Sequence, residues 1–198
     1  MEEVHLRVAR VSDAAALLAI YAPYVRDTAI TFEYDVPEEG EFAARIEHVL
    51  EKFPYLVAEA NGEIVGYAYA GTFHPRAAYQ WCVEMSVYVK RNARRMGIGK
   101  KLYAAMEDIL RMQRVTNVEA CIAVPNEPDE HLTLDSMHFH ERMGYRMVGE
   151  FRQCGYKFGR WYNMVWMEKF IGEHVSEQPP VLRFEQIKGD VHEKMNIA

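Results

Sequence analysis

Apolar and polar residues alternate along residues 81–89, which read Trp-Cys-Val-Glu-Met-Ser-Val-Tyr-Val. A period of two is typical of a β-strand with one face in a hydrophobic core. The pattern therefore predicts a strand with Glu84 near its middle. It places Val83, Met85, Val87 and Val89 on the core face, and Cys82, Glu84, Ser86 and Tyr88 on the other face.

A basic turn that contains glycine follows this strand and leads into a helix. The turn spans residues 91–99, and Ile98, Leu102, Ala105 and Ile109 then recur at helical spacing. Upstream, two β-rich runs at residues 55–60 and 63–70 are separated by Asn61-Gly62, a pair that supplies the two positive-φ residues of a type I′ turn. We therefore expect a hairpin, then a strand–loop–helix unit.

The remaining patterns complete an α/β order of β-α-α-β-β-β-α-β-α-β-β. Ser12 is the expected N-cap of the first helix, which runs to about Val25, and Pro37 opens the second. We predict a sheet of mixed direction with helices on both faces. The other expected elements are strands at 5–8, 117–124, 145–151 and 162–170, and a helix at 135–143 that ends at Gly144.

Apolar periodicity fades after Phe170, and Pro179-Pro180 interrupts the chain soon afterwards. Residues 1–170 have the length of one domain. We expect residues 171–198 to form a tail that is either disordered or packed on a partner.

Composition narrows the class of protein. Of the 198 residues 49% are hydrophobic and 12% are aromatic, enough for a real core, and the net charge of −6 argues against a general nucleic-acid binder. Neither a signal-peptide pattern nor an apolar run long enough to span a membrane is present. Three widely spaced cysteines indicate reduced thiols, hence a cytoplasmic location, and the spacing of His131, His138 and His140 matches no zinc signature, so no metal is expected.

The segment Arg94-Arg95-Met96-Gly97-Ile98-Gly99 has the features of a phosphate-binding loop. A helix N-terminus presents unpaired N–H groups, glycines allow an anion to approach closely, and two arginines add positive charge. The simpler interpretation is a glycine-containing turn with solvated arginines. A nucleotide P-loop is rejected because Lys101 stands where Ser or Thr must hold Mg²⁺, and a dinucleotide fingerprint is rejected because the loop lies mid-chain.

This loop, Arg-x-x-Gly-x-Gly after Val87-Tyr88-Val89, resembles the coenzyme A loop of the GCN5-related N-acetyltransferase (GNAT) family. Within that family, residues 1 to about 170 resemble the phosphinothricin N-acetyltransferase group. The resemblance implies the GNAT fold, a mostly antiparallel twisted sheet of about seven strands. Matching segments lie at residues 6–10, 31–33, 53–59, 67–71, 76–79, 83–89, 125–128, 140–145 and 155–161.

The resemblance also implies an activity, direct transfer of an acetyl group from acetyl-CoA to the amine of a small amino-acid-like molecule. The acceptor class is that of phosphinothricin, methionine sulfoximine and methionine sulfone. The amine must lose a proton to react, and the family's base aligns with Glu84, whose apolar neighbours are expected to raise its pKa. The simpler interpretation of Glu84 is a plain position on the polar face of a half-buried strand.

The resemblance assigns further roles by position. His140 aligns with the group that reprotonates the leaving thiolate; the simpler interpretation is a surface or cofactor-contacting histidine. Phe32 and Arg76, with Tyr79 beside them, match an aromatic wall and a carboxylate-binding arginine; without the resemblance they read as a core aromatic and a solvated arginine. The cofactor-binding candidates are Val87, Tyr88, Val89, Arg94, Arg95, Met96, Gly97, Ile98, Gly99, Lys100, Asn126 and Ser136.

Two departures from the family pattern remain, the tail and an acidic insert of about seven residues between Asn126 and Ser136. An acidic lid favours a more cationic acceptor, whereas a solvated loop has no such effect. The segment at residues 155–161 lies near a dimer contact in relatives, which implies a homodimer. The competing functions are acetylation of another amine (a polyamine, an aminoglycoside or a protein N-terminus) and CoA binding without turnover.

Overall fold

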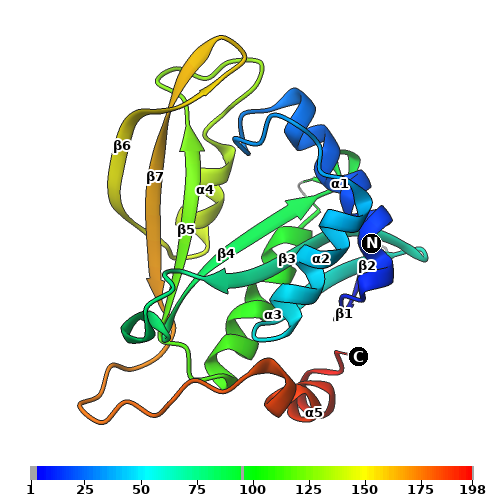
Figure 1. Ribbon diagram of the computed structural model, residues 1–198, viewed down its shortest axis with the longest axis vertical. Helices are drawn as coiled ribbons and strands as arrows, with labels where there is room; N and C mark the ends of the chain where they lie inside the picture. The colour runs from blue at the N-terminus through cyan, green and yellow to red at the C-terminus, as the bar shows by residue number, and fades with distance from the viewer. Residues whose placement is uncertain (1–3, 95, 198) are drawn as a thin grey trace.

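Seven strands form one sheet in the order β1-β2-β3-β4-β5-β7-β6 in the computed structural model, which describes residues 4–94 and 96–197 (Figure 1). Neighbouring strands run antiparallel except β4 and β5, which are parallel. This confirms the mixed, mostly antiparallel sheet. The strands are β1 (His5–Val8), β2 (Tyr55–Ala60), β3 (Glu63–Thr72), β4 (Cys82–Val89), β5 (Asn117–Val124), β6 (Arg146–Lys157) and β7 (Arg160–Phe170).

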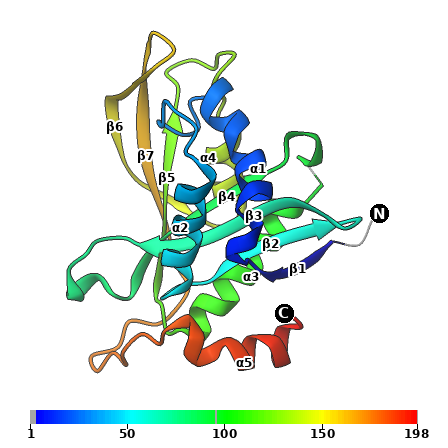
Figure 2. The same ribbon diagram turned by 45° about the vertical axis from the view of Figure 1, so that its right-hand side comes forward.

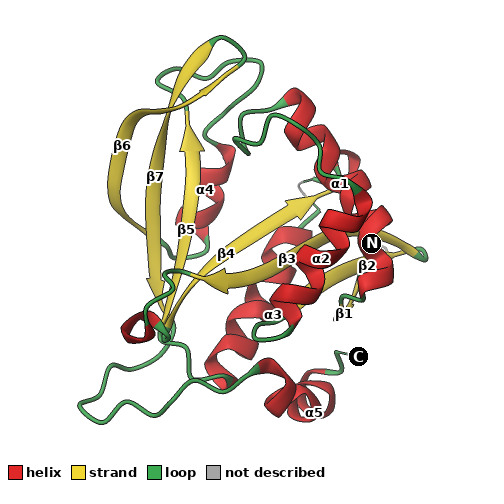
Figure 3. Cartoon of the chain, viewed as in Figure 1, coloured by secondary structure: helices red, strands yellow, loops and turns green. Residues whose placement is uncertain are grey.

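Helices cover both faces of the sheet, as expected (Figure 3). The first two helices pack on a cluster that contains Tyr55 and Tyr67, whereas the third packs on a separate cluster that contains Val83 and Met85. The two faces of β4 therefore separate as the alternation predicts. The α-helices in the described residues are α1 (Ala14–Asp27), α2 (Glu39–Leu50), α3 (Ile98–Met112), α4 (Asp135–Arg142) and α5 (Phe184–Met195).

The sheet opens between β4 and β5, and this opening positions the site. The two strands pair only where residues 82–84 meet residues 117–119, and they diverge beyond Glu84 (Figure 1). From that point β5 continues beside β7, whereas the remaining residues of β4 keep a strand neighbour only in β3. One edge of β4 is consequently available to another group.

The start of α1 differs from the expected N-cap. Ser12 lies inside a short 3-10 turn, Val11–Asp13, and α1 begins at Ala14. The Asp13 carboxylate accepts the backbone N–H of Arg10 at 2.7 Å and forms an ion pair with Arg7 at the same distance. Asp13 therefore organises the turn, because its carboxylate also reaches a charged partner on β1.

The C-terminal segment, expected to be disordered or packed on a partner, contains a helix that packs on this chain. Residues 184–195 form α5, and Phe184, Ile187 and Val191 are buried in the same core as α3. Gln113 at the end of α3 donates to the carbonyl oxygen of Leu182 at 2.7 Å, so the segment is tied to its own chain (Figure 2). The apolar periodicity of residues 184–195 is short, but Phe184, Ile187 and Val191 share one helical face. The domain boundary near residue 170 stays a prediction.

Candidate active site

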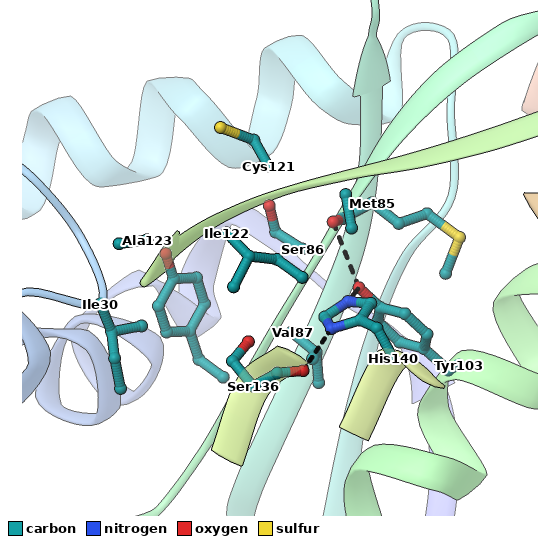
Figure 4. Close-up of a pocket in the computed structure, with 12 residues that line it drawn as sticks. Ile30, Met85, Ser86, Val87, Tyr103, Cys121, Ile122, Ala123, Ser136 and His140 are labelled. Atoms are coloured by element: carbon teal, nitrogen blue, oxygen red, sulfur yellow. Dashed lines mark hydrogen bonds between the residues drawn. The ribbon is translucent and has the colours of Figure 1, made fainter. Parts of the chain in front are cut away.

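A pocket with about 460 Å³ of empty space, part of it open to solvent, occupies the opening between β4 and β5 (Figure 4). Its lining comes from both faces of the sheet, since Ser86 and Tyr88 point to the α1–α2 side while Met85 and Val87 point to the α3 side. The pocket is thus accessible to groups on both faces. The remaining lining residues are Ile30, Tyr103, Ala120, Cys121, Ile122, Ala123, Ser136 and His140.

The main chain of β4 presents one residue to this pocket. The N–H of Lys90 donates to the carbonyl oxygen of Val65 at 2.8 Å, so the even-numbered residues pair with β3 and the odd-numbered residues face the opening. At that edge the Met85 carbonyl accepts the Tyr103 hydroxyl at 3.2 Å, and the Val89 N–H donates to the Tyr24 hydroxyl at 3.3 Å. Val87 lies between them, so its N–H and C=O face the pocket.

Glu84 is half-buried at the last position where β4 pairs with β5. Burial raises the pKa of the Glu84 carboxyl, which confirms the direction expected from its apolar neighbours. Its negative charge raises the pKa of Tyr69 on the α1–α2 face and of Tyr103 on the α3 face, secondary to their burial. The Glu84 carboxylate therefore acts electrostatically on groups of both faces.

His140 is 4% exposed and forms two hydrogen bonds. Its Nδ1 lies 2.8 Å from the Ser136 carbonyl oxygen, and its Nε2 lies 2.9 Å from the Tyr103 hydroxyl (Figure 4). Burial lowers the pKa of His140 to about 4, although the Ser136 contact opposes this shift. The sequence analysis did not select Tyr103 as a site residue. The one feature that could have indicated it is its position next to Leu102, on the core face of a predicted helix.

The candidate phosphate loop ends at a helix start, as predicted. Gly97 has a φ of +79°, a conformation that favours glycine, and α3 begins at Ile98. The first intrahelical bond runs from Lys101 N–H to Gly97 O, which leaves the N–H groups of Ile98, Gly99 and Lys100 without helical partners. Arg94 stacks its guanidinium over the Tyr24 ring at 5.1 Å, and Met96 is exposed. Arg95 lies outside the described residues.

The two other cofactor candidates differ in position. Ser136 lines the pocket. Asn126 is not part of the pocket lining; its side-chain oxygen accepts the Asn163 amide at 3.0 Å, and that amide also donates to Glu150. Asn126 is therefore tied to β6 and β7.

The three acceptor candidates lie at two ends of the sheet face that carries Glu84. Phe32, after α1, lies against β6 and has its ring 6.5 Å from that of Tyr162 on β7. Arg76 is exposed on the β3–β4 loop, where Tyr79 packs on Phe73 and Phe73 packs on Trp166. Residues 162 and 166 share one face of β7 and are about 13 Å apart at the usual rise. The structure thus places Phe32 at one end and the Arg76 loop at the other.

A buried lysine fixes the loop that carries Phe32. Lys157 is 3% exposed, and its ammonium donates to the carbonyl oxygens of Val25, Thr28 and Thr31 at 2.8, 2.9 and 2.8 Å. All three donors of the ammonium are used. The loop after α1 is therefore attached to the end of β6.

The insert is an ordered turn in which two of its acidic residues are paired. The Asp129 carboxylate accepts the N–H groups of His131 and Leu132, both at 2.8 Å, and the Tyr162 hydroxyl at 3.0 Å. Arg160 forms ion pairs with Asp129 at 2.9 Å and Glu130 at 3.1 Å. Because both carboxylates are held by Arg160, which neutralises one of their two charges, Asp129 and Glu130 do not form a free acidic lid.

The described ranges, 4–94 and 96–197, lack two other kinds of site. Within them, no set of three or more His, Cys, Asp or Glu side chains is arranged to hold a metal ion. In the same ranges, no helix has both the length and the apolar character needed to cross a membrane.

The chain is similar to known acetyltransferases in sequence and in structure. The chain is 34% identical to phosphinothricin N-acetyltransferase of Streptomyces viridochromogenes, covering 84% of this chain and 88% of that protein. It is also 34% identical to L-methionine sulfoximine/L-methionine sulfone acetyltransferase of Pseudomonas aeruginosa, covering 82% and 92%. A phosphinothricin acetyltransferase of Sinorhizobium meliloti, solved with AcCoA, superposes with a TM-score of 0.80 at 28% identity, covering 91% and 98%.

A second solved structure, a putative acetyltransferase of Salmonella typhimurium with acetyl-CoA, also gives a TM-score of 0.80, at 29% identity, covering 88% of this chain and 97% of that one. The family model described as "Acetyltransferase (GNAT) domain" matches residues 6–166. That match runs from β1 into β7 and includes the opening with its candidate phosphate loop. The chain belongs to the GNAT acetyltransferase family.

Proposed function

We propose that this protein is an N-acetyltransferase that moves an acetyl group from acetyl-CoA to the amine of a small amino-acid-like molecule. The observation that carries the proposal is the opening between β4 and β5, which has a free main-chain edge and the Glu84 carboxylate beside it. Acetyl-CoA is the cosubstrate. Phosphinothricin, methionine sulfoximine and methionine sulfone are the proposed acceptors, as the names of the relatives indicate.

The cofactor side uses main-chain donors. The unpaired N–H groups at the start of α3 suit the pyrophosphate of CoA, because a helix N-terminus carries partial positive charge and free donors. The Val87 N–H is the donor proposed for the thioester carbonyl, where negative charge develops during attack. The Tyr24 hydroxyl already forms hydrogen bonds with the N–H and the carbonyl oxygen of Val89. The Val87 N–H is therefore the main-chain donor that we assign to the thioester carbonyl.

On the acceptor side, Glu84 is the proposed general base in a direct transfer within a ternary complex. A carboxyl group with a raised pKa removes a proton from an ammonium more effectively than an ordinary one. Arg76 is exposed and thus available for a bidentate bond to the acceptor's carboxylate. Phe32 and Tyr79 are proposed as aromatic contacts, and His140 as a residue of the catalytic set.

Three competing functions differ from this proposal in acceptor or in turnover. The pairing of Asp129 and Glu130 with Arg160 weakens the argument for a cationic acceptor such as a polyamine or an aminoglycoside. Acetylation of a protein N-terminus is the second, and CoA binding without turnover is the third. We favour turnover because a half-buried carboxylate with a raised pKa serves proton transfer but has no role in binding CoA alone.

A homodimer in the cytoplasm completes the proposal. Large apolar side chains are exposed along the β6–β7 hairpin, where β6 is an edge strand, and such a strip favours contact with a second copy. Light scattering should give twice the chain mass, and Phe151→Glu should return it to that of the monomer. The three cysteines are free thiols, which suits a reducing compartment. The exposed residues are Met147, Val148, Phe151, Tyr156, Phe158 and Trp161.

The proposal is tested by thiol release from acetyl-CoA across a panel of amino-acid analogues and other amines. We expect turnover with the methionine sulfone class and a loss of about 100-fold in kcat for Glu84→Gln, with acetyl-CoA affinity retained. Glu63→Gln is the matched control, since Glu63 is an exposed glutamate on the same sheet. Tight CoA binding without turnover on any amine would establish the binding role instead.

The Arg76 assignment has its own test on the same panel. Arg76→Ala should raise KM for acceptors that bear a carboxylate and leave amines without one unaffected, because the bidentate bond is lost only for the former. Arg152→Ala, at an exposed arginine on β6, is the control. An equal rise in KM for both acceptor types removes Arg76 from carboxylate recognition.

A further inference from the structure

A second pocket lies where the end of α2, the end of β3 and the start of α5 meet. It has about 500 Å³ of empty space, part of it open to solvent. Figure 1 shows α5 beginning below the C-terminal end of α2. Arg183, the residue before α5, lines this pocket, whereas the GNAT family model ends at residue 166. The second pocket therefore depends on a segment beyond the residues that the family model matches.

The end of β3 has a free main-chain edge at this pocket. Pairing with β2 begins where Tyr55 lies opposite Tyr69, and the Ala70 N–H donates to the carbonyl oxygen of Pro54 at 3.3 Å. Main-chain groups of alternate residues face the same neighbouring strand, so the N–H of Thr72 also faces the β2 side. Thr72 lies beyond the end of this pairing and lines the pocket. Its N–H is thus directed toward the pocket.

Lys52 would be the next partner of Thr72, but its carbonyl oxygen is used elsewhere. Continuing the β2–β3 register places residue 52 opposite residue 72. The Lys52 carbonyl oxygen instead accepts the N–H of Phe184 at 3.0 Å and the side-chain amide of Gln113 at 2.9 Å. Because both lone pairs of this oxygen are occupied, it does not accept the Thr72 N–H. The packing of α5 therefore keeps this main-chain donor available to a ligand.

Two cations give the pocket an excess of positive charge. The Lys52 ammonium lies 4.9 Å from the centre of the Phe53 ring, and Arg183 is exposed. In the part of the chain that the structure describes, neither side chain forms an ion pair. Glu51 is the one acid in the lining of this pocket, and its carboxylate lies 3.7 Å from Nδ1 of His48. The pocket therefore favours an anion.

We propose that this pocket binds small organic carboxylates that have an apolar body and no positive charge. The Thr72 N–H, the Lys52 ammonium and the Arg183 guanidinium hold the carboxylate, since a planar guanidinium donates two parallel hydrogen bonds to such a group. Val49 and Phe53 contact the apolar body. A zwitterionic amino acid binds less well, because its ammonium group is repelled by the same two cations.

This pocket is separate from the proposed acceptor site. Arg76 is not part of its lining, and Glu84 lies on β4, on the opposite side of β3. One source of a suitable carboxylate is the acetylated product, since acetylation removes the positive charge of an amino acid and leaves its carboxylate. This identification rests on the proposed function, whereas the site itself does not. The other source is an organic acid unrelated to the reaction.

The test is isothermal titration calorimetry of the whole chain with 4-methylpentanoate at low salt. We expect saturable binding that is about tenfold weaker for Arg183→Gln and for Lys52→Gln, because each variant loses a charged donor. Lys188→Gln, at an exposed lysine on α5, is the matched control and should bind like the wild type. Thermal melting should show that each variant folds. No saturable binding, or an affinity unchanged in both pocket variants, would overturn the proposal.

Two further ligands isolate the role of charge. L-leucine is 4-methylpentanoate with an added α-ammonium group, and 4-methylpentanamide has an uncharged amide in place of the carboxylate. We expect neither to show binding that Arg183→Gln weakens. Binding of either ligand as tight as that of 4-methylpentanoate, and weakened to the same extent by Arg183→Gln, would contradict selection for an anion without positive charge.

The source of the ligand is identified with N-acetyl-L-methionine sulfone. Binding that Arg183→Gln weakens and Arg76→Ala leaves unchanged would support the acetylated product as a ligand of this pocket. If only 4-methylpentanoate shows this dependence, the pocket is assigned to other organic acids. Calorimetry without acetyl-CoA needs no turnover, so a chain that acetylates no amine can still bind here. An active transferase whose two pocket variants bind 4-methylpentanoate like the wild type would overturn this site alone.

Discussion

The two faces of the sheet beside the opening are held together by different interactions. On the α3–α4 face, the groups around the pocket are aromatic and neutral, since Tyr103, His140 and Tyr145 pack with their ring centroids within 6.0 Å of one another. On the α1–α2 face, the two helices pack on an apolar cluster, but charges hold the loop after α1 and the insert in place. Lys157 binds three carbonyl oxygens, and Arg160 pairs with Asp129 and Glu130.

The difference follows from the kind of segment that lies on each face. The α3–α4 face is formed by helices that pack on the sheet, so shape and burial position its side chains. The α1–α2 face includes a long loop and the insert, which bury few apolar side chains, so hydrogen bonds and ion pairs position them. Substitutions should therefore alter the two faces in distinguishable ways, and pH should act on them in opposite directions.

The largest expected effect is on the charged face, from Lys157→Met. The change leaves three buried carbonyl oxygens without their donor, so the free energy of unfolding should fall by about 4 kcal/mol. Chemical denaturation measures this, with Lys188→Met at an exposed lysine as the control. Lys157→Arg should recover only part of the loss, because a planar guanidinium fits three converging carbonyls less well. A loss under about 1 kcal/mol for Lys157→Met would contradict the idea that charge organises this face.

On the neutral face, His140 should make the protein sensitive to acid. Its folded pKa is lowered from 6.5 to about 4, so the stability it contributes is complete above pH 6.5 and is lost as pH falls toward 4. At about 1.4 kcal/mol per pKa unit the loss is about 3 kcal/mol. Denaturation curves from pH 7 to 4 should show a smaller decline for His140→Gln than for the wild type. Parallel declines would mean that His140 is protonated in the folded state.

Glu119 on the opposite face should have the reverse pH dependence. It is 7% exposed on β5, lies opposite Glu168 on β7, and receives the Cys82 thiol at 3.5 Å. Burial, with a smaller contribution from Glu168, raises its pKa from 4.5 to about 7. Its stability contribution is therefore complete below pH 4.5 and is lost as pH rises toward 7.

The corresponding variant is Glu119→Gln, which stays neutral at every pH. We expect it to exceed the wild type in unfolding free energy by about 3 kcal/mol at pH 8, with the difference shrinking as pH falls to 4.5. Glu141→Gln, at an exposed glutamate, should show no such trend. A difference between Glu119→Gln and the wild type that does not change with pH would show that Glu119 is ionised in the folded protein throughout this range.

The smallest expected effect tests the packing between the acceptor loop and β6. A Cβ at Gly155 would lie 2.2 Å from the Phe32 ring, so Gly155→Ala should cost about 2 kcal/mol and raise KM for the acceptor. The double variant Gly155→Ala, Phe32→Leu should recover stability, since the clash is removed. Gly149→Ala is the control, because nothing lies within 4 Å of a Cβ there. Additive losses in the double variant would rule out this contact as the cause.

Local patterns predicted the elements that form the opening. The alternation in residues 81–89 predicted the correct faces of β4, because side chains of a strand point to alternate sides whatever it packs against. Asn61-Gly62 formed the expected turn, with φ values of 53° and 77°. Gly97 followed by Ile98 marked the helix start for the same reason, since these conformations depend on neighbours in sequence.

The tertiary structure decided the contacts between distant residues. The Tyr24 hydroxyl forms hydrogen bonds with the main chain of Val89, and the Tyr103 hydroxyl forms one with His140, which lies on another helix. The α5 segment packs on α3, and Arg160 pairs with Asp129 and Glu130 of the insert. None of these is encoded in a periodic pattern, because each depends on how helices and strands pack in space. The amino-acid sequence determined which groups were available, and packing determined which of them meet and which protons they keep.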